Sequence, residues 1–121
     1  MSESESLQFS NVTALAKANV YFGGKVLSHT IMAEDGLRRT LGVIFPGRYH
    51  FDTQAAEMMD IVAGSCAVTV DGHADTHSYG VGARFVLPAD SGFAIEVADG
   101  LCEYVCAFLP EGAGAAAGSN E

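Results

Sequence analysis

Short segments of alternating apolar and polar residues cover most of the chain, and glycine-containing turns separate them. This alternation is typical of β-strands, whose successive side chains point to opposite faces. We expect turns at 34–36, 46–47, 64, 71–72 and 99–100, the last two as hairpins between paired strands. Roughly eight or nine short strands, with a turn about every ten residues, indicate an all-β sandwich or barrel.

The sequence divides into one expected domain and two flanking segments. Residues 19–110 hold the strand pattern and are predicted to form the barrel domain. Residues 1–18, which begin with acidic and serine residues, are expected to be a flexible leader, and 111–121 a disordered tail rich in glycine and alanine. Within the leader, residues 11–18 favour a short helical turn.

The formal net charge of −9 narrows the range of partners. Nucleic-acid binding needs clustered Lys and Arg to contact phosphates, so we expect no nucleic-acid partner. No apolar segment approaches the ~20 residues of a membrane span, and we predict a soluble cytoplasmic protein without a membrane partner. The odd number of cysteines, Cys66, Cys102 and Cys106, fits a reducing compartment, and each is expected to be a small buried side chain.

The segment 47–64 carries an ordered set of polar residues. His50, Asp52 and Glu57 follow the spacing H-x-D-x4-E, and a glycine closes an E-x6-G pattern after Glu57. A second segment, 82–88, has the spacing G-x5-P. The two segments resemble the two sequence motifs of the cupin superfamily, which implies a single cupin-like jelly-roll β-barrel of short antiparallel strands.

The same motifs depart from the cupin pattern where a metal would be bound. Asp52 stands in place of the second histidine of the first motif, and Phe93 in place of the histidine of the second. A phenyl ring has no lone pair to offer as a ligand, so we predict no bound metal. The alternative that stays open is a metal-dependent cupin enzyme that uses His50, Asp52 and Glu57.

One predicted strand has an ambiguous orientation. In the cupin register His50 and Asp52 face the barrel interior, while Tyr49, Phe51 and Thr53 face outward. Outward aromatic rings need cover, most simply from a second subunit, and we therefore expect a homodimer. A one-residue bulge would exchange the two faces.

Five segments together resemble one family more specifically. They are 19–26, 42–53, 57–64, 84–93 and 103–109. They are similar to the small single-domain cupin family of pyrimidine/purine nucleoside phosphorylases, formerly a domain of unknown function. The resemblance implies a pentosyltransferase that converts purine and pyrimidine nucleosides to free base and ribose 1-phosphate, with inorganic phosphate as co-substrate and no cofactor. A non-catalytic small-molecule-binding cupin is the other alternative.

Phosphorolysis requires an anion site, groups for the ribose hydroxyls and a surface for the base. The resemblance favours Lys25 and Arg38 as phosphate-binding cations, whereas Arg48 and Arg84 follow turns and are expected on the surface. Glu57 begins a strongly apolar strand, and we predict that it contacts the ribose. The alternative for Glu57 is a buried ion pair with Arg38 or Lys25.

The catalytic candidates are therefore Glu57, Lys25 and Arg38. Phe93, at a former ligand position, is expected to stack on the base. The full set of expected substrate-binding residues lies on predicted strands and comprises Tyr49, His50, Asp52, Thr53, Phe93, Glu96 and Tyr104.

Overall fold

The computed structural model describes residues 7–110, which form eleven β-strands and one short 3₁₀ turn, η2. The elements are β1 (Thr13–Ala14), β2 (Asn19–Tyr21), η2 (Phe22–Gly24), β3 (Val26–Met32), β4 (Arg38–Ile44), β5 (Gly47–Thr53), β6 (Glu57–Ala63), β7 (Ser65–Val70), β8 (Thr76–Gly80), β9 (Arg84–Leu87), β10 (Ser91–Val97) and β11 (Cys102–Phe108). The predicted all-β class is confirmed. In the described part of the chain, no helix is long and apolar enough to cross a membrane.

The segments flanking the expected domain are only partly described. Residues 1–6 of the expected leader and the expected tail, 111–121, lie outside the described residues. Residues 11–18, where we expected a helical turn, contain β1, which pairs with β3 in an antiparallel manner. The helical prediction was wrong because pairing with an available sheet edge outweighs the weak local capping signal.

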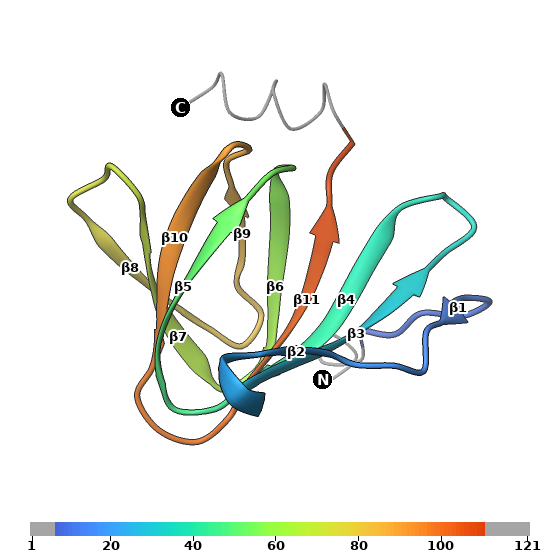
Figure 1. Ribbon diagram of the computed structural model, residues 1–121, viewed down its shortest axis with the longest axis horizontal. Helices are drawn as coiled ribbons and strands as arrows, with labels where there is room; N and C mark the ends of the chain where they lie inside the picture. The colour runs from blue at the N-terminus through green and yellow to red at the C-terminus, as the bar shows by residue number, and fades with distance from the viewer. Residues whose placement is uncertain (1–6, 111–121) are drawn as a thin grey trace.

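The strands form two antiparallel sheets that face each other (Figure 1). The order in the larger sheet is β1-β3-β4-β11-β6-β9, and β2 also pairs with β3. The order in the smaller sheet is β5-β10-β7-β8. Strands that follow one another in sequence therefore often lie in different sheets, as in a jelly-roll-like sandwich.

Four connections cross between the sheets at one end of the molecule: β4–β5, β6–β7, β8–β9 and β10–β11 (Figure 1). We predicted a hairpin at the turn 99–100. This prediction was wrong, because β10 and β11 belong to different sheets. At the β6–β7 crossing, Gly64 has φ 75°, and a Cβ there would overlap the carbonyl oxygen of Leu101. The hairpin predicted at 71–72 is confirmed between β7 and β8.

The core between the sheets is apolar. Ile44, Ile61, Ile95 and Val97 are at most 2% exposed, and burying each such side chain stabilises the fold by about 1.5–3 kcal/mol. The three cysteines are free and buried, as expected from the sequence.

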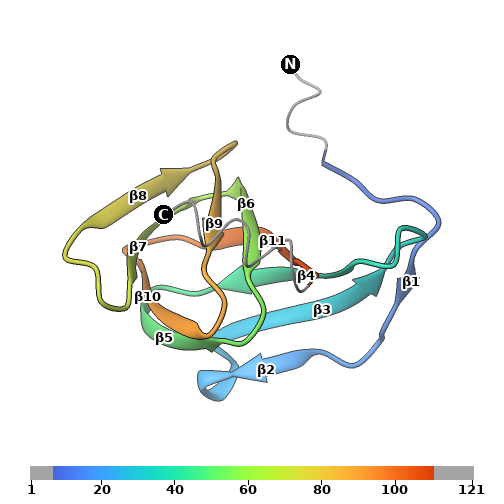
Figure 2. The same ribbon diagram turned by 90° about the horizontal axis from the view of Figure 1, so that it is seen from above.

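One edge of the sandwich is covered by β2 and η2, which lie beside β5 (Figure 2). Aromatic rings make the contact: Tyr21 meets Phe51 at a centroid distance of 5.5 Å, and Phe22 meets Tyr49 at 5.1 Å. The tight turn depends on Gly23, because its φ of 65° would be strained for a residue with a side chain. This turn brings the side chains of β2 to the opening between the sheets.

Candidate functional site

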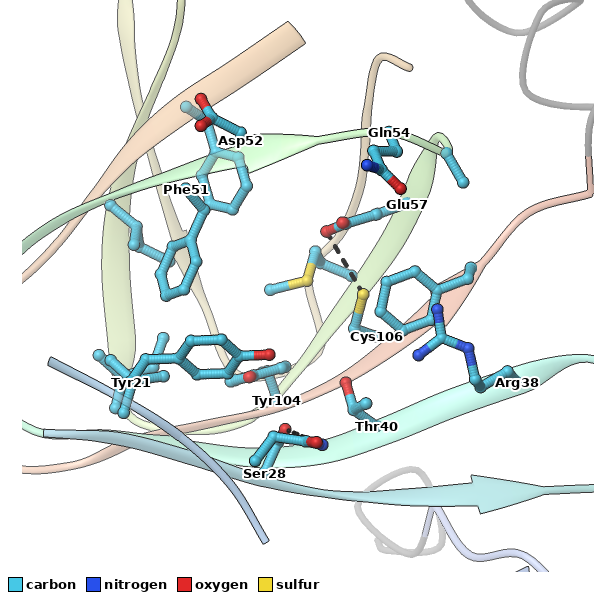
Figure 3. Close-up of a pocket in the computed structure, with 18 residues that line it drawn as sticks. Tyr21, Ser28, Arg38, Thr40, Phe51, Asp52, Gln54, Glu57, Tyr104 and Cys106 are labelled. Atoms are coloured by element: carbon cyan, nitrogen blue, oxygen red, sulfur yellow. Dashed lines mark hydrogen bonds between the residues drawn. The ribbon is translucent and has the colours of Figure 1, made fainter. Parts of the chain in front are cut away.

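A cavity of about 380 Å³ opens between the two sheets at the end opposite to the four crossing connections. The larger sheet contributes β3, β4, β6 and β11 to its wall, the smaller sheet contributes β5 and β10, and β2 closes one side (Figure 3). The polar lining includes Ser28, Arg38, Thr40, Glu57, Tyr104 and Cys106.

The register of the larger sheet arranges these side chains in rows. Inward-facing residues that pair across neighbouring antiparallel strands lie side by side. From the open end inward, the rows are Arg38, Phe108 and Glu57; then Thr40, Cys106 and Met59; then Ser28, Gly42 and Tyr104. A charged row at the mouth therefore leads to uncharged polar rows deeper in the cavity.

Arg38 is the cation of this site. Among residues 7–110, it is the Lys or Arg that lines the cavity. Its guanidinium lies over the ring of Phe108, with Cζ 3.9 Å from the ring centroid (Figure 3). This is a cation–π contact, and the N–H groups of a guanidinium are donors that can bind an anion.

The other expected cations lie outside the cavity. Lys25 follows η2 and is exposed, so the structure does not bring this catalytic candidate to the site. Arg48 and Arg84 are on the surface, as predicted, where they pair with Glu96 at 3.8 Å and with Asp60 at 2.8 Å. Glu96, an expected substrate-binding residue, is therefore also outside the cavity.

Glu57 is partly buried at the start of β6 and points into the cavity (Figure 3). Burial raises the pKa of its carboxyl, while the Cys106 thiol and the charge of Arg38 act in the opposite direction. Its direct contact is with Cys106, whose Sγ donates to Oε1 at 3.5 Å. Arg38 acts on Glu57 only through longer-range electrostatics, so this contact is not the ion pair considered as an alternative.

Aromatic rings form the wall opposite the larger sheet. Phe93 is 5% exposed and lines the cavity. Its ring stacks on that of Phe51, with centroids 5.7 Å apart and planes inclined by 24°. Tyr21 meets Phe51 edge-on, and its hydroxyl points into the cavity (Figure 3). These rings offer an apolar surface of the kind on which a nucleobase stacks.

The strand β5 faces the opposite way from the cupin register. Tyr49 and Thr53 are 6% and 5% exposed, and Phe51 lines the cavity, so these three point inward. His50 and Asp52 point outward. The predicted inward orientation of His50 and Asp52 was wrong because burying aromatic rings is favourable and burying charged groups is costly.

Tyr49 and Thr53 hold the fold rather than line the cavity. The Tyr49 hydroxyl donates to the carbonyl of Phe45 at 2.8 Å. The Thr53 hydroxyl donates to the carbonyl of Pro88 at 2.7 Å and accepts from the backbone N–H of Ser91 at 3.0 Å. These bonds fasten both ends of β5, which carries Phe51 between them.

A polar cluster lies on the outer face of the smaller sheet. His50 Nε2 is 2.9 Å from Asp71 Oδ2, and His50 Nδ1 is 3.9 Å from Asp52 Oδ1. Ligand atoms of these three exposed residues lie within 4.8 Å of one another. Glu57 points into the cavity on the other side of this sheet, so the structure does not bring together the His50, Asp52 and Glu57 set of the metal-dependent alternative. Asp52 also lines the cavity, although its side chain is 90% exposed.

Several lining residues were not predicted. Ser28, Thr40 and Cys106 stand at inward positions of β3, β4 and β11, and nothing in the local sequence marks them as cavity residues. Tyr21 was missed because its strand reaches the cavity only through the turn at η2. Phe51 was assigned to the wrong face.

The fold places the chain in a structural class. The chain is a small cupin-like jelly roll: a solved structure of an oxalate decarboxylase, a cupin-fold protein, superposes with a TM-score of 0.59 at 19% identity, covering 74% of this chain and 27% of that one. At this identity the likeness concerns the fold alone. A protein of unknown function from Acinetobacter sp. ADP1 is more similar, with a TM-score of 0.80 at 39% identity over 84% of this chain and 98% of that one.

Sequence comparison then identifies the family. The model of the pyrimidine/purine nucleoside phosphorylase family matches residues 16–108. A pyrimidine/purine nucleoside phosphorylase from Methylococcus capsulatus is 54% identical over 101 residues, which cover 84% of this chain and 97% of the relative. Another, from Cupriavidus taiwanensis, is 51% identical over 104 residues, covering 86% and 98%. The chain belongs to the pyrimidine/purine nucleoside phosphorylase family.

Proposed function

We propose that this protein is a nucleoside phosphorylase, a pentosyltransferase that converts a purine or pyrimidine nucleoside and inorganic phosphate to free base and ribose 1-phosphate. Membership of the family supports the reaction. The structural observation that carries the proposal is the cavity mouth, where Arg38 stacks on Phe108 beside the carboxyl of Glu57. A cation and a carboxyl at one end of an aromatic-walled cavity fit a substrate with an anion, a sugar and a base.

Arg38 binds the phosphate in this proposal. A guanidinium donates two parallel hydrogen bonds to a phosphate, and these charge-assisted bonds are stronger than bonds between neutral groups. Stacking on Phe108 restricts the guanidinium before substrate arrives, which reduces the entropy lost on binding. The chain has a net charge of −9, so a local cation is needed to hold the phosphate near carboxylates.

Glu57 acts on the sugar. The glycosidic bond breaks through a state in which the ribose ring carries positive charge. In its ionised form, the Glu57 carboxylate accepts hydrogen bonds from ribose hydroxyls and stabilises this charge, and the phosphate does the same from the opposite face to the base. The Cys106 thiol, which donates to Glu57 at 3.5 Å, orients the carboxylate. Holding phosphate and sugar in line supplies a further part of the rate.

The base binds among the aromatic rings. Phe51 and Phe93 form a stacked pair on the smaller sheet, and Tyr104 lies on the larger sheet opposite them. The cavity volume of about 380 Å³ lies within the ~300–1,000 Å³ range of small-molecule sites. Stacking on rings accepts purines and pyrimidines alike, since both have a flat π-face.

The reaction needs no cofactor in this proposal, since inorganic phosphate is the second substrate and no electrons are transferred. Nucleosides and phosphate are therefore the partners. We also expect a cytoplasmic location, where both substrates are available. Release of base that depends on phosphate and continues in the presence of a chelator tests the proposal.

A homodimer is part of the proposal on different grounds from those given by the sequence. Tyr49 and Phe51 face inward and so offer nothing for a second subunit to cover. The outer face of β4, β11 and β6 is apolar instead, with Leu41 39% exposed beside the partly buried Val43 and Val62. A second copy on this face would bury these side chains, and sedimentation equilibrium measures whether it does.

A further inference from the structure

Gly42 occupies an unfavourable position for a glycine. It is buried in the middle of β4, where a glycine loses more backbone freedom than other residues and has no side chain to pack. Its backbone conformation does not demand glycine, because its φ lies outside the left-handed region. A glycine in such a place marks a close approach by another group.

The group that approaches is the side chain of Tyr104. Gly42 and Tyr104 are partners across β4 and β11. A Cβ at Gly42 would overlap the ring carbons and the hydroxyl oxygen of Tyr104. The missing side chain therefore lets the Tyr104 ring lie across β4, toward Ser28, the partner of Gly42 on β3 (Figure 3). This fixes the Tyr104 hydroxyl on the deepest polar row of the cavity.

That row lies far from the phosphate site. Gly42 stands four positions after Arg38 along β4, which at ~3.3 Å per residue is about 13 Å. In phosphorolysis the phosphate and the base occupy opposite faces of the reacting sugar carbon. With phosphate on Arg38, the sugar falls beside Glu57 and Cys106, and the base extends toward Tyr104.

We propose that Tyr104, positioned by Gly42, hydrogen-bonds to the edge of the nucleobase and that these two residues form the base-edge subsite. The assignment rests on the proposed function, since it takes the phosphate to bind at Arg38. A hydroxyl both donates and accepts hydrogen bonds, so one residue serves the keto edge of one base and the amino edge of another. The ordinary pKa of a tyrosine lies well above neutral pH and burial raises that of Tyr104 further, so this hydroxyl is protonated at neutral pH.

The reverse reaction separates the base from the sugar. With uracil and ribose 1-phosphate as substrates, Tyr104→Phe keeps the ring and removes only the hydroxyl. We expect the KM for uracil to rise about tenfold, as for the loss of one buried hydrogen bond, and the KM for ribose 1-phosphate to stay unchanged. Tyr79→Phe is the matched control, because Tyr79 stacks on Phe85 outside the cavity and should alter neither constant. An unchanged KM for uracil in Tyr104→Phe, or an equal rise for both substrates, would overturn the assignment.

Gly42→Ala tests the positioning role. The added methyl displaces the Tyr104 ring, so the KM for uracil should rise while that for ribose 1-phosphate does not. The double variant Gly42→Ala with Tyr104→Val should bind uracil no worse than Tyr104→Val alone, because neither the ring nor the hydroxyl is left to position. A merely structural role for Gly42 predicts additive losses that affect both substrates.

Folding and ligand binding provide two further tests of the Gly42 and Tyr104 assignment. If Gly42→Ala does not fold, combining it with Tyr104→Val should restore folding by removing the overlapping ring; a double variant that still fails to fold contradicts the positioning role. A wild-type protein without activity in either direction would contradict the proposed function itself. Calorimetry with uridine would then test the subsite alone, and equal dissociation constants for wild type and Tyr104→Phe would reject it.

Discussion

The guanidinium carbon of Arg38 lies 3.9 Å from the centroid of the Phe108 ring, at the mouth of the cavity. This contact joins the first residue of β4 to the last residue of β11 and fixes the direction of the cation that the proposed reaction uses. Loss of this contact should weaken the binding of phosphate more than the binding of the nucleoside.

Replacing Phe108 by leucine keeps an apolar side chain but removes the π-face. We expect the KM for phosphate to rise about two- to fivefold, the size of a cation–π contact near the surface. Initial rates at varied phosphate and saturating uridine measure the change. Phe9→Leu is the matched control, because Phe9 lies under Arg39 at 5.2 Å, away from the cavity. Equal effects of the two variants would contradict this role for Phe108.

Arg38→Ala should lower kcat/KM for phosphate about ten- to hundredfold, because it removes charge-assisted hydrogen bonds to the anion. Arg38→Lys should recover only part of the loss, since an ammonium lacks the planar fork of the guanidinium. Arg84→Ala and Lys25→Ala are the comparisons, both at exposed positions outside the cavity. If kcat/KM for phosphate falls as far in Lys25→Ala as in Arg38→Ala, Lys25 takes part in the site and the phosphate does not bind where we propose.

Glu57→Gln preserves the shape of the side chain but removes its negative charge. We expect kcat to fall at least about tenfold, while circular dichroism stays unchanged, because the charge that stabilises the cationic sugar is lost. Glu96→Gln makes the same change on an exposed strand position and should leave kcat unaffected. Full activity of Glu57→Gln would mean that the carboxylate has no part in the reaction.

The burial of Glu57 should also make the stability of the fold depend on pH. Burial raises its pKa above the ordinary value of 4.5, so the native protein holds this proton more tightly than the unfolded chain does. The protonated Glu57 carboxyl therefore contributes its full share to the stability of the fold below about pH 4.5. This contribution is lost as pH rises through the raised pKa of the folded state. The free energy of unfolding of Glu57→Gln should exceed that of wild type increasingly above this pH. Urea titrations at a series of pH values measure the difference, and a constant difference would contradict the assigned cause.

The sequence predicted the strands better than their partners. Alternation and turn residues act locally, so β4, β5, β10 and the 71–72 hairpin could be found from them. The choice of sheet is not local: the turn at 99–100 has the composition of a hairpin, yet it carries the chain from one sheet to the other.

The site was predictable only in part, for the same physical reason. Glu57 begins an apolar strand and is conspicuous in the sequence, whereas Arg38 was favoured through the resemblance to the family. Ser28 and Thr40 are ordinary strand residues, and only the register of four strands brings them together. The motif resemblance placed His50 inside, whereas the burial of the neighbouring aromatic residues decides the orientation of β5.

The central claim is that the cavity transfers ribose from a base to phosphate. Purified protein is incubated with uridine and a chelator, with and without phosphate, and uracil is measured by chromatography while the sugar product is followed by phosphorus NMR. Uracil and ribose 1-phosphate should appear together in equal amounts, and only when phosphate is present. Uracil released without phosphate, activity abolished by the chelator, or no base from uridine, cytidine, adenosine or guanosine would contradict the proposal.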